Sequence, residues 1–284
     1  MTRPGLAALF GVLAGLSFCD RVDSRPLPSA PTARSLLALA RDAHENTPEE
    51  VEWAAAELER IATRVREAVG APGSNEENAP SIPVLNEVVF GALGFVREVD
   101  DPSLRSVLLP SVLRNRRGNC VGLGTLYLAL GEMLSLKMEG VLRPGHFFVR
   151  MREGTRVHNA ELLRKGEEMP DSWYAERFPI PAGDGGPYGR GLSLAEVRGV
   201  VEYDLGNERR RQGRIAEARN AYEQSTRDLP DFAEAYASLG AMQQLLGALD
   251  EAETSYAAAR RASPGLSGLE RNIELLKRER DAVR

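Results

Sequence analysis

Hydrophobic residues recur at helical spacing along much of the chain, and polar or Pro-rich stretches separate these segments. The second such segment has a clear start signal, because Thr47 can cap a helix and Glu50 completes a capping box. The Asp-Asp-Pro-Ser run at 100–103 is also typical of a helix start. The pattern predicts helices at about 34–44, from Pro48 onward, at about 83–95 and at about 102–116.

The next segment is apolar on nearly all sides. It opens with Gly118-Asn119-Cys120 and continues as VGLGTLYLALGEML, which predicts a buried central helix. A glycine inside a helix costs roughly 1 kcal/mol relative to Ala, so glycines here indicate close approach of another backbone. The glycines concerned are Gly122, Gly124 and Gly131.

After this helix the hydrophobic period changes to two, which is typical of strands. Arg143-Pro144-Gly145 is a predicted turn, and Glu153-Gly154 is a predicted two-residue hairpin turn. A buried helix beside an antiparallel sheet indicates an α+β domain, which we place at 34–180. The predicted strands lie near 138–142, at 146–151 and at 155–162.

The C-terminal part repeats with a period of about 34 residues, which is the tetratricopeptide pattern. It is expected to follow a linker at 181–191 and to fill 192–284, with a capping helix at 267–284. Two repeats rarely stand alone, so we expect them to pack on the N-terminal domain, with or without a groove for a protein partner. The matching pairs are Leu205/Leu239, Gly206/Gly240, Gly213/Gly247, Ala218/Ala252, Tyr222/Tyr256 and Pro230/Pro264.

The N-terminus has the pattern of an export signal. Residues 1–19 contain one Arg and an apolar run that is short for a membrane span. The run ends in Leu-Ser-Phe-Cys, which resembles a bacterial lipobox except that Phe18 replaces a small residue. We expect an exported protein, periplasmic or membrane-anchored, with a tether at 20–33 and possible lipid attachment at Cys19. An uncleaved anchor is the alternative, and in either case the N-terminus alone would contact a membrane.

Composition excludes several classes of protein. With 43% hydrophobic and 27% charged residues, the chain of 284 residues is typical of a soluble globular protein. The net charge of −5 argues against a nucleic-acid partner. Two cysteines exclude a disulfide scaffold and a multi-cysteine zinc site, and we expect no metal and no cofactor.

Two arginine-rich stretches are expected to be structural. The arginines at 114, 116 and 117 either steer an anionic substrate or cover a helix end. Those at 209–211 are mixed with acidic residues, which favours a solvated helix face over a nucleic-acid patch.

Cys120 and His146 are the candidates for chemistry. Cys120 lies at the predicted start of a buried helix, where the helix dipole and unpaired N–H groups lower a thiol pKa. Its backbone N–H could also face an oxyanion. Alternatively, it is a small buried hydrophobic residue, as free cysteines usually are. His146 begins a strand after a turn, and a Cys followed by a His is the arrangement of thiol catalysis.

A third candidate for the catalytic group follows from the predicted strand register. If Glu153-Gly154 is the turn, His146 faces Glu161, and Asn159 lies one diagonal step away on the same face. Glu161 is then the better group to orient His146, and Asn159 is the reserve. His158 points to the other face and is expected to be structural or exposed.

These motifs resemble the core of bacterial transglutaminase-like proteins, and more narrowly the SirB-type proteins, which often carry tetratricopeptide repeats. The resemblance covers about 83–180 and implies a papain-like fold, with Cys120 as nucleophile, His146 as base and Glu161, where the family usually has Asp, as orienting group. The stretches that carry it are LNEVVFGALGF, SVLRNRRGNCVGLGTLYLALGEML, GVLRPGHFFVRM and VHNAELLRKGE.

The expected activity is acyl transfer from a peptide or protein amide. Water as acceptor gives a peptidase or amidase, and an amine as acceptor gives a crosslink. Some SirB-type relatives lack the cysteine, so a non-catalytic scaffold or binding module with a repeat-bound partner is the alternative.

Overall fold

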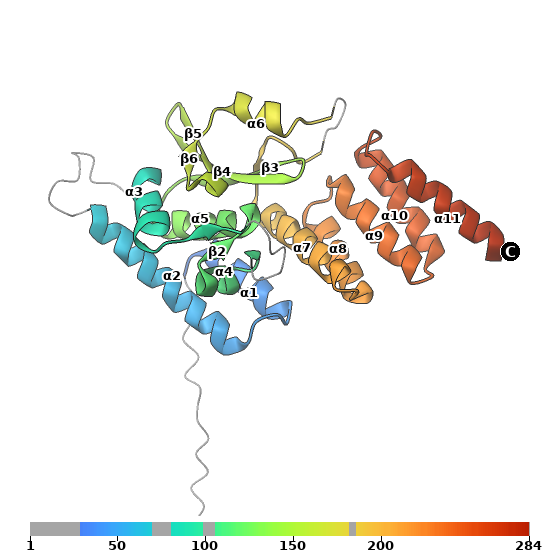
Figure 1. The fold of residues 1–284 in the computed structure, drawn as a ribbon, viewed down its shortest axis with the longest axis horizontal. Coiled ribbons are helices and arrows are strands. Elements are labelled where there is room, and N and C mark those ends of the chain that lie inside the picture. Colours follow the sequence, from blue (N-terminus) through green and yellow to red (C-terminus); the bar gives the residue numbers. More distant parts are fainter. Residues whose placement is uncertain (1–28, 70–80, 99–105, 182–185, 284) are drawn as a thin grey trace, which may run out of the picture.

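The computed structural model describes residues 29–69, 81–98, 106–181 and 186–283. The predicted export signal, most of the tether and the start signal at 100–103 lie outside these ranges. No helix within them is long and apolar enough to cross a membrane. A sheet with helices on both faces forms the N-terminal part, and a row of helices forms the C-terminal part (Figure 1).

The N-terminal helices follow the predicted order with shifted ends. Thr47 and Glu50 form the predicted capping box, in which each side chain accepts the other's backbone N–H. The first helix starts at Pro31, inside the expected tether, because proline suits a first helical turn. The helices are α1 Pro31–Asp42, α2 Pro48–Val69, α3 Ile82–Asn86 and α4 Leu109–Asn115.

Two of the predicted helices differ in detail. The segment expected at 83–95 is α3 followed by a π-helix, Glu87–Ala92. The described part of the segment expected at 102–116 becomes α-helical only at Leu109, where Pro110 occupies the first turn. Two short parallel strands, β1 Val96–Arg97 and β2 Arg117–Gly118, flank α4.

Helix α5, Cys120–Met133, is the predicted buried central helix. Asn119 caps it, because its side-chain oxygen accepts the Gly122 N–H at 2.8 Å. A Cβ at Gly122 would lie 2.0 Å from the backbone oxygen of Ser106, as expected for a close backbone approach. At Gly124 and Gly131 the close neighbours are instead the side chains of Phe147 and Met138, at 2.4 and 2.6 Å.

The main sheet within the described residues has the order β6-β5-β4-β3-β7. Glu153 pairs with Arg156, so the hairpin turn is Gly154-Thr155 and the predicted turn at Glu153-Gly154 is wrong. Gly154 takes the first central position with φ of 58°, a conformation that glycine adopts easily. The strands are β3 Met138–Arg143, β4 His146–Glu153, β5 Arg156–Glu161, β6 Glu167–Glu168 and β7 Gly191–Leu192.

The predicted linker at 181–191 is in part wrong. Its end forms β7, which pairs with β3, and the Gly189 N–H donates to the Leu142 carbonyl at 2.8 Å. Tyr188 also bridges to Leu142. Small residues let the chain follow the sheet edge closely, so the described part of this segment belongs to the fold.

The C-terminal helices confirm the repeat pattern. Gly206 lies against the ring of Tyr222, and Gly240 lies equivalently against Tyr256. Helix α7 also shares one hydrophobic core with α5, so the repeats do pack on the N-terminal domain. The helices are α7 Leu194–Arg211, α8 Ile215–Asp228, α9 Ala233–Leu245, α10 Leu249–Ala262 and the capping helix α11 Leu269–Val283.

The arginines at 209–211 do not form a uniform solvated face. Arg209 is buried, and its guanidinium donates to the Ala43 carbonyl at the end of α1, at 2.8 Å. Arg211 pairs with Glu208 on the same helix. Arg209 is buried because α7 packs against the N-terminal helices, which a local charge pattern does not reveal.

Candidate functional site

Cys120 is the first residue of α5 and is half-buried at the end of the sheet. The backbone N–H groups of Phe147 and Val121 point toward its sulfur and favour a thiolate. Burial is the stronger effect and, with the charges of Asp204 and Glu161, raises the pKa of the Cys120 thiol to about 12. The expected lowering by the helix N-terminus is therefore outweighed, and the resting thiol is protonated at neutral pH.

His146 and Glu161 form a buried pair. The His146 Nε2 lies 2.7 Å from a Glu161 carboxylate oxygen, and both side chains are almost fully buried. The other Glu161 oxygen accepts the Leu163 N–H at 3.1 Å. Within the part of the chain that the structure describes, Nδ1 of His146 forms no hydrogen bond, so this nitrogen is available for proton transfer.

Aromatic side chains from α6, Asp171–Arg177, and its end hold the imidazole in place. The ring of Phe178 stacks on His146 with centroids 4.1 Å apart, and that of Tyr174 lies 6.1 Å away. Burial, and then the Glu161 carboxylate, raise the pKa of the Tyr174 phenol. His146 is thus fixed by a carboxylate at one edge and by aromatic rings on its face.

The observed pairing of β4 with β5 is shifted by two residues from the register that predicted Glu161. A turn at Glu153-Gly154 would place Asn159 opposite Phe148, but Asn159 faces Arg150, and Ala160 pairs with Val149. A shift of two keeps every side chain on its predicted face, because the period of a strand is two. Glu161 therefore still reaches His146, along a diagonal.

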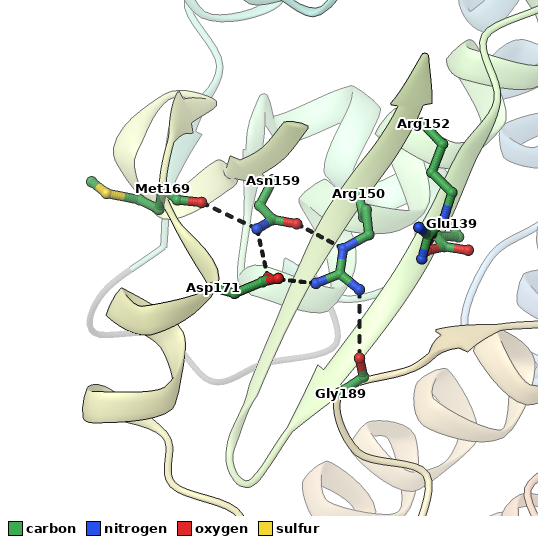
Figure 2. A network of polar contacts seen from close by, with 7 residues as sticks. All are labelled: Glu139, Arg150, Arg152, Asn159, Met169, Asp171 and Gly189. Carbon is green, nitrogen blue, oxygen red and sulfur yellow. Dashed lines mark hydrogen bonds and ion pairs between the residues drawn. The ribbon is translucent and has the colours of Figure 1, made fainter. Parts of the chain in front are cut away.

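Asn159, the reserve orienting group, forms no hydrogen bond with His146. Its side-chain oxygen accepts from Arg150 at 2.8 Å, and its amide donates to the Met169 carbonyl and to Asp171 (Figure 2). Arg150 continues the network to Asp171 at 2.6 Å and to the Gly189 carbonyl at 3.5 Å. Asn159 thus has a structural position in the fold.

This network fixes the segments that surround His146. Asp171 is the first residue of α6, which carries Tyr174, and Gly189 lies in the strip that leads to β7. Sequence reasoning missed Arg150, although a charged residue inside the apolar strand HFFVRM is a signal for a buried ion pair.

Cys120 and His146 line one cavity of about 290 Å³. Strands β3 and β4 and the start of α5 supply one wall, and helices α7 and α9 with the loop before α9 supply the other. Glu161 stands behind His146 and does not line this cavity. Its lining residues include Arg143, Tyr203, Asp204, Asn207 and Glu234.

The other predicted positions lie apart from this cavity. His158 contacts Glu168 at 3.0 Å and is partly exposed, and Arg114 covers the ring of Trp53. Arg116 donates to the Leu93 carbonyl. These arginines cover helix ends. In the described ranges, no three His, Cys, Asp or Glu side chains gather as metal ligands.

Residues 52–170 match the family model of the Transglutaminase-like superfamily, and residues 203–267 match that of the Tetratricopeptide repeat. The chain contains a transglutaminase-like domain. The transglutaminase-like domain and the repeats together support a protein-interaction module on a papain-like fold.

No curated protein matches the chain. Among solved structures, one match is a crystal structure of menin described as revealing the binding site for Mixed Lineage Leukemia (MLL) protein. It is 13% identical, with a TM-score of 0.41, and the match covers 89% of this chain and 75% of that chain. A similarity this low has no bearing on function.

Proposed function

We propose that this protein is a thiol-dependent acyl-transfer enzyme of the SirB type that acts on peptide or protein amides. The observation that carries the proposal is the buried His146–Glu161 pair, whose histidine shares a cavity with the nucleophile candidate Cys120. The match of this region to the Transglutaminase-like superfamily supports it.

The chemistry begins with a neutral thiol. Because burial and carboxylates raise the pKa of Cys120 to about 12, His146 must remove the thiol proton as the sulfur attacks. The sulfur bonds to the amide carbon, and the C–N bond breaks as His146 returns the proton to the leaving amine. Water or a second amine then attacks the thioester and releases the thiol. Glu161 stabilises the imidazolium that forms in both steps.

The start of α5 can stabilise the oxyanion. The backbone N–H of Cys120 is in the first turn of the helix, where N–H groups have no intrahelical acceptor. Asn119 caps the same turn and fixes its direction. Removal of one such donor typically costs about a hundredfold or more in rate.

A second candidate is a non-catalytic binding module. The observation in its favour is the raised pKa of Cys120, since most cysteine nucleophiles are activated by a lowered pKa. On that alternative the cavity binds a peptide without reacting with it.

Hydrolysis of p-nitrophenyl acetate by the full chain distinguishes the enzyme from the non-catalytic binding module. The thiol displaces p-nitrophenol, and water then releases acetate. We expect hydrolysis that falls about a hundredfold or more in Cys120→Ala and in His146→Gln, and that is unchanged in His158→Gln. Hydrolysis that survives Cys120→Ala, or that never exceeds the rate with free cysteine, would remove the enzyme proposal.

We also propose that residues 1–19 direct export. The support is the apolar run with one Arg that ends at Cys19. A full-length fusion to a reporter that is active only outside the cytoplasm should be active in a bacterial host, and loss of residues 1–19 should abolish that activity. Release from the membrane in Cys19→Ser would indicate lipid attachment.

A further inference from the structure

The repeat region forms one wall of the cavity that contains Cys120. Tyr203, Asp204 and Asn207 come from α7, and Glu234 comes from α9. The site that the transglutaminase-like domain contributes is therefore closed by residues far along the chain, and two of these four residues are carboxylic acids.

Asp204 is held close to the nucleophile. Its carboxylate accepts from the Asn119 side-chain amide at 3.2 Å, and the oxygen of the same Asn119 side chain caps α5. One side chain thus links Asp204 to the turn that begins with Cys120. Among the described residues, no arginine or lysine lies within ion-pair distance of Asp204, although Arg211 acts on it from further away.

The charge of Asp204 is poorly compensated. Burial raises the pKa of Asp204 to about 6, despite hydrogen bonds from the Asn119 and Asn207 side chains and the charge of Arg211. Asp204 also contributes the largest charge effect on the Cys120 thiol, which it disfavours as a thiolate. A positive group placed beside Asp204 would compensate the carboxylate and remove its opposition to the thiolate.

Arg143 stands on the opposite wall. It pairs with His146 across the β3–β4 turn, so both side chains lie on the same face of the sheet. The cavity thus has a basic residue beside the histidine and acidic residues on the repeat side. A positive group of a ligand would be favoured beside Asp204 and disfavoured beside Arg143.

We propose that Asp204 is a specificity-determining residue that selects substrates carrying a positive charge, as in a lysine or arginine side chain, next to the reactive amide. This inference rests on the proposed function for its substrate, but the charge preference of the cavity can be measured without turnover.

The first test uses methanethiosulfonate reagents that carry a trimethylammonium or a sulfonate group. The Cys120 thiolate attacks the sulfenyl sulfur, forms a mixed disulfide and releases methanesulfinate. Rates at Cys120 in the full chain are followed by peptide mass spectrometry, which counts Cys19 separately, and each is divided by the rate with free cysteine. We expect the cationic reagent to be favoured about tenfold, and the preference to fall severalfold in Asp204→Asn.

Glu202→Gln is the matched control, because Glu202 is on the same helix but lines a different hollow, near Asp42 and Arg198. The preference for the cationic reagent should be unchanged in Glu202→Gln. No charge preference in the wild-type protein, or a preference equally strong in Asp204→Asn, would overturn the inference. Either result is independent of the ester assay, which tests the proposed function alone.

The second test uses p-nitrophenyl esters whose acyl chain ends in a trimethylammonium, a methyl or a carboxylate group. We expect kcat/KM to be highest for the cationic ester, with Asp204→Asn removing most of its advantage over the methyl and carboxylate esters. An advantage that persists in Asp204→Asn would contradict the role given to Asp204.

Discussion

The side chain of Cys120 is subject to two opposing influences. The N–H groups of Phe147 and Val121 favour the thiolate, whereas burial and the carboxylates of Asp204 and Glu161 favour the thiol. Burial and the carboxylates have the larger effect, so the pKa of the Cys120 thiol rises. The proposed catalysis therefore depends on His146 as a base during attack, and it involves no stable ion pair between sulfur and imidazole.

Alkylation of Cys120 by iodoacetamide should report this balance. With a pKa of about 12, the thiolate fraction and hence the labelling rate should rise about tenfold per pH unit across the neutral and mildly alkaline range, without a plateau. Asp204→Asn removes a negative charge, lowers the thiol pKa and should speed labelling at each pH. A plateau below the ordinary thiol pKa of about 8.5 would contradict this.

The sequence predicts which residues belong to the site better than it predicts the surroundings of each one. Glu161 follows from a register that is two residues out, and it survives because strand faces alternate with a period of two. The pKa of Cys120 is not predictable in this way, because Asp204 reaches it from a helix distant in the sequence. The position of Cys120 at a helix N-terminus predicts only the effect of the nearest backbone groups on its pKa.

Helix α5 and strand β4 approach so closely that glycine is required between them. Phe147 lies over Gly124, where a Cβ would be 2.4 Å from its ring, and it also covers Gly140. The same strand begins with His146. Close packing at Phe147 therefore positions both residues proposed for catalysis, the histidine through the strand and the cysteine through the helix.

Gly124→Ala should destabilise the protein by about 1–3 kcal/mol, because the added methyl forces Phe147 to move. Intrinsic helix propensity alone predicts the opposite sign. The control is Gly91→Ala, where the nearest atom would be 3.9 Å away. Urea unfolding measures both variants. Equal stability of Gly124→Ala and the wild-type protein would refute the close approach.

Elements are predicted better than their ends. The central helix and three strands follow from an apolar run and a change of period. The π-helix at Glu87–Ala92 and the pairing of β7 with β3 escape such reasoning. A π-helix and a strand formed by Gly191–Leu192 depend on tertiary contacts, and neither leaves a periodic pattern in so few residues.

At the scale of the whole molecule, the two matched regions are parts of one structure. Val200, Val201 and Leu205 of α7 belong to the same hydrophobic core as α5. The cavity with Cys120 exists only where both regions meet. The sequence predicts that the repeats pack on the N-terminal domain, but it does not show that they line the site, since periodicity does not specify which faces meet.

Val201→Ala should weaken both regions together, by about 1–3 kcal/mol, because it leaves a cavity in the shared core. Hydrogen exchange should show reduced protection in α5 as well as in α7. Leu276→Ala on α11 is the control, and it should reduce protection only near the C-terminal cap. Unchanged protection of α5 in Val201→Ala would show that the regions unfold independently.

The most direct measurement is to look for the acyl-enzyme on Cys120. The full chain is mixed with p-nitrophenyl acetate, quenched with acid at short times and digested, and acetyl groups are located by mass spectrometry. We expect an acetyl thioester at Cys120 that forms rapidly, decays with release of acetate, and forms at least about a hundredfold more slowly in His146→Gln. Acetylation of Cys120 at the same rate in both proteins, or none at all at this residue, would contradict it.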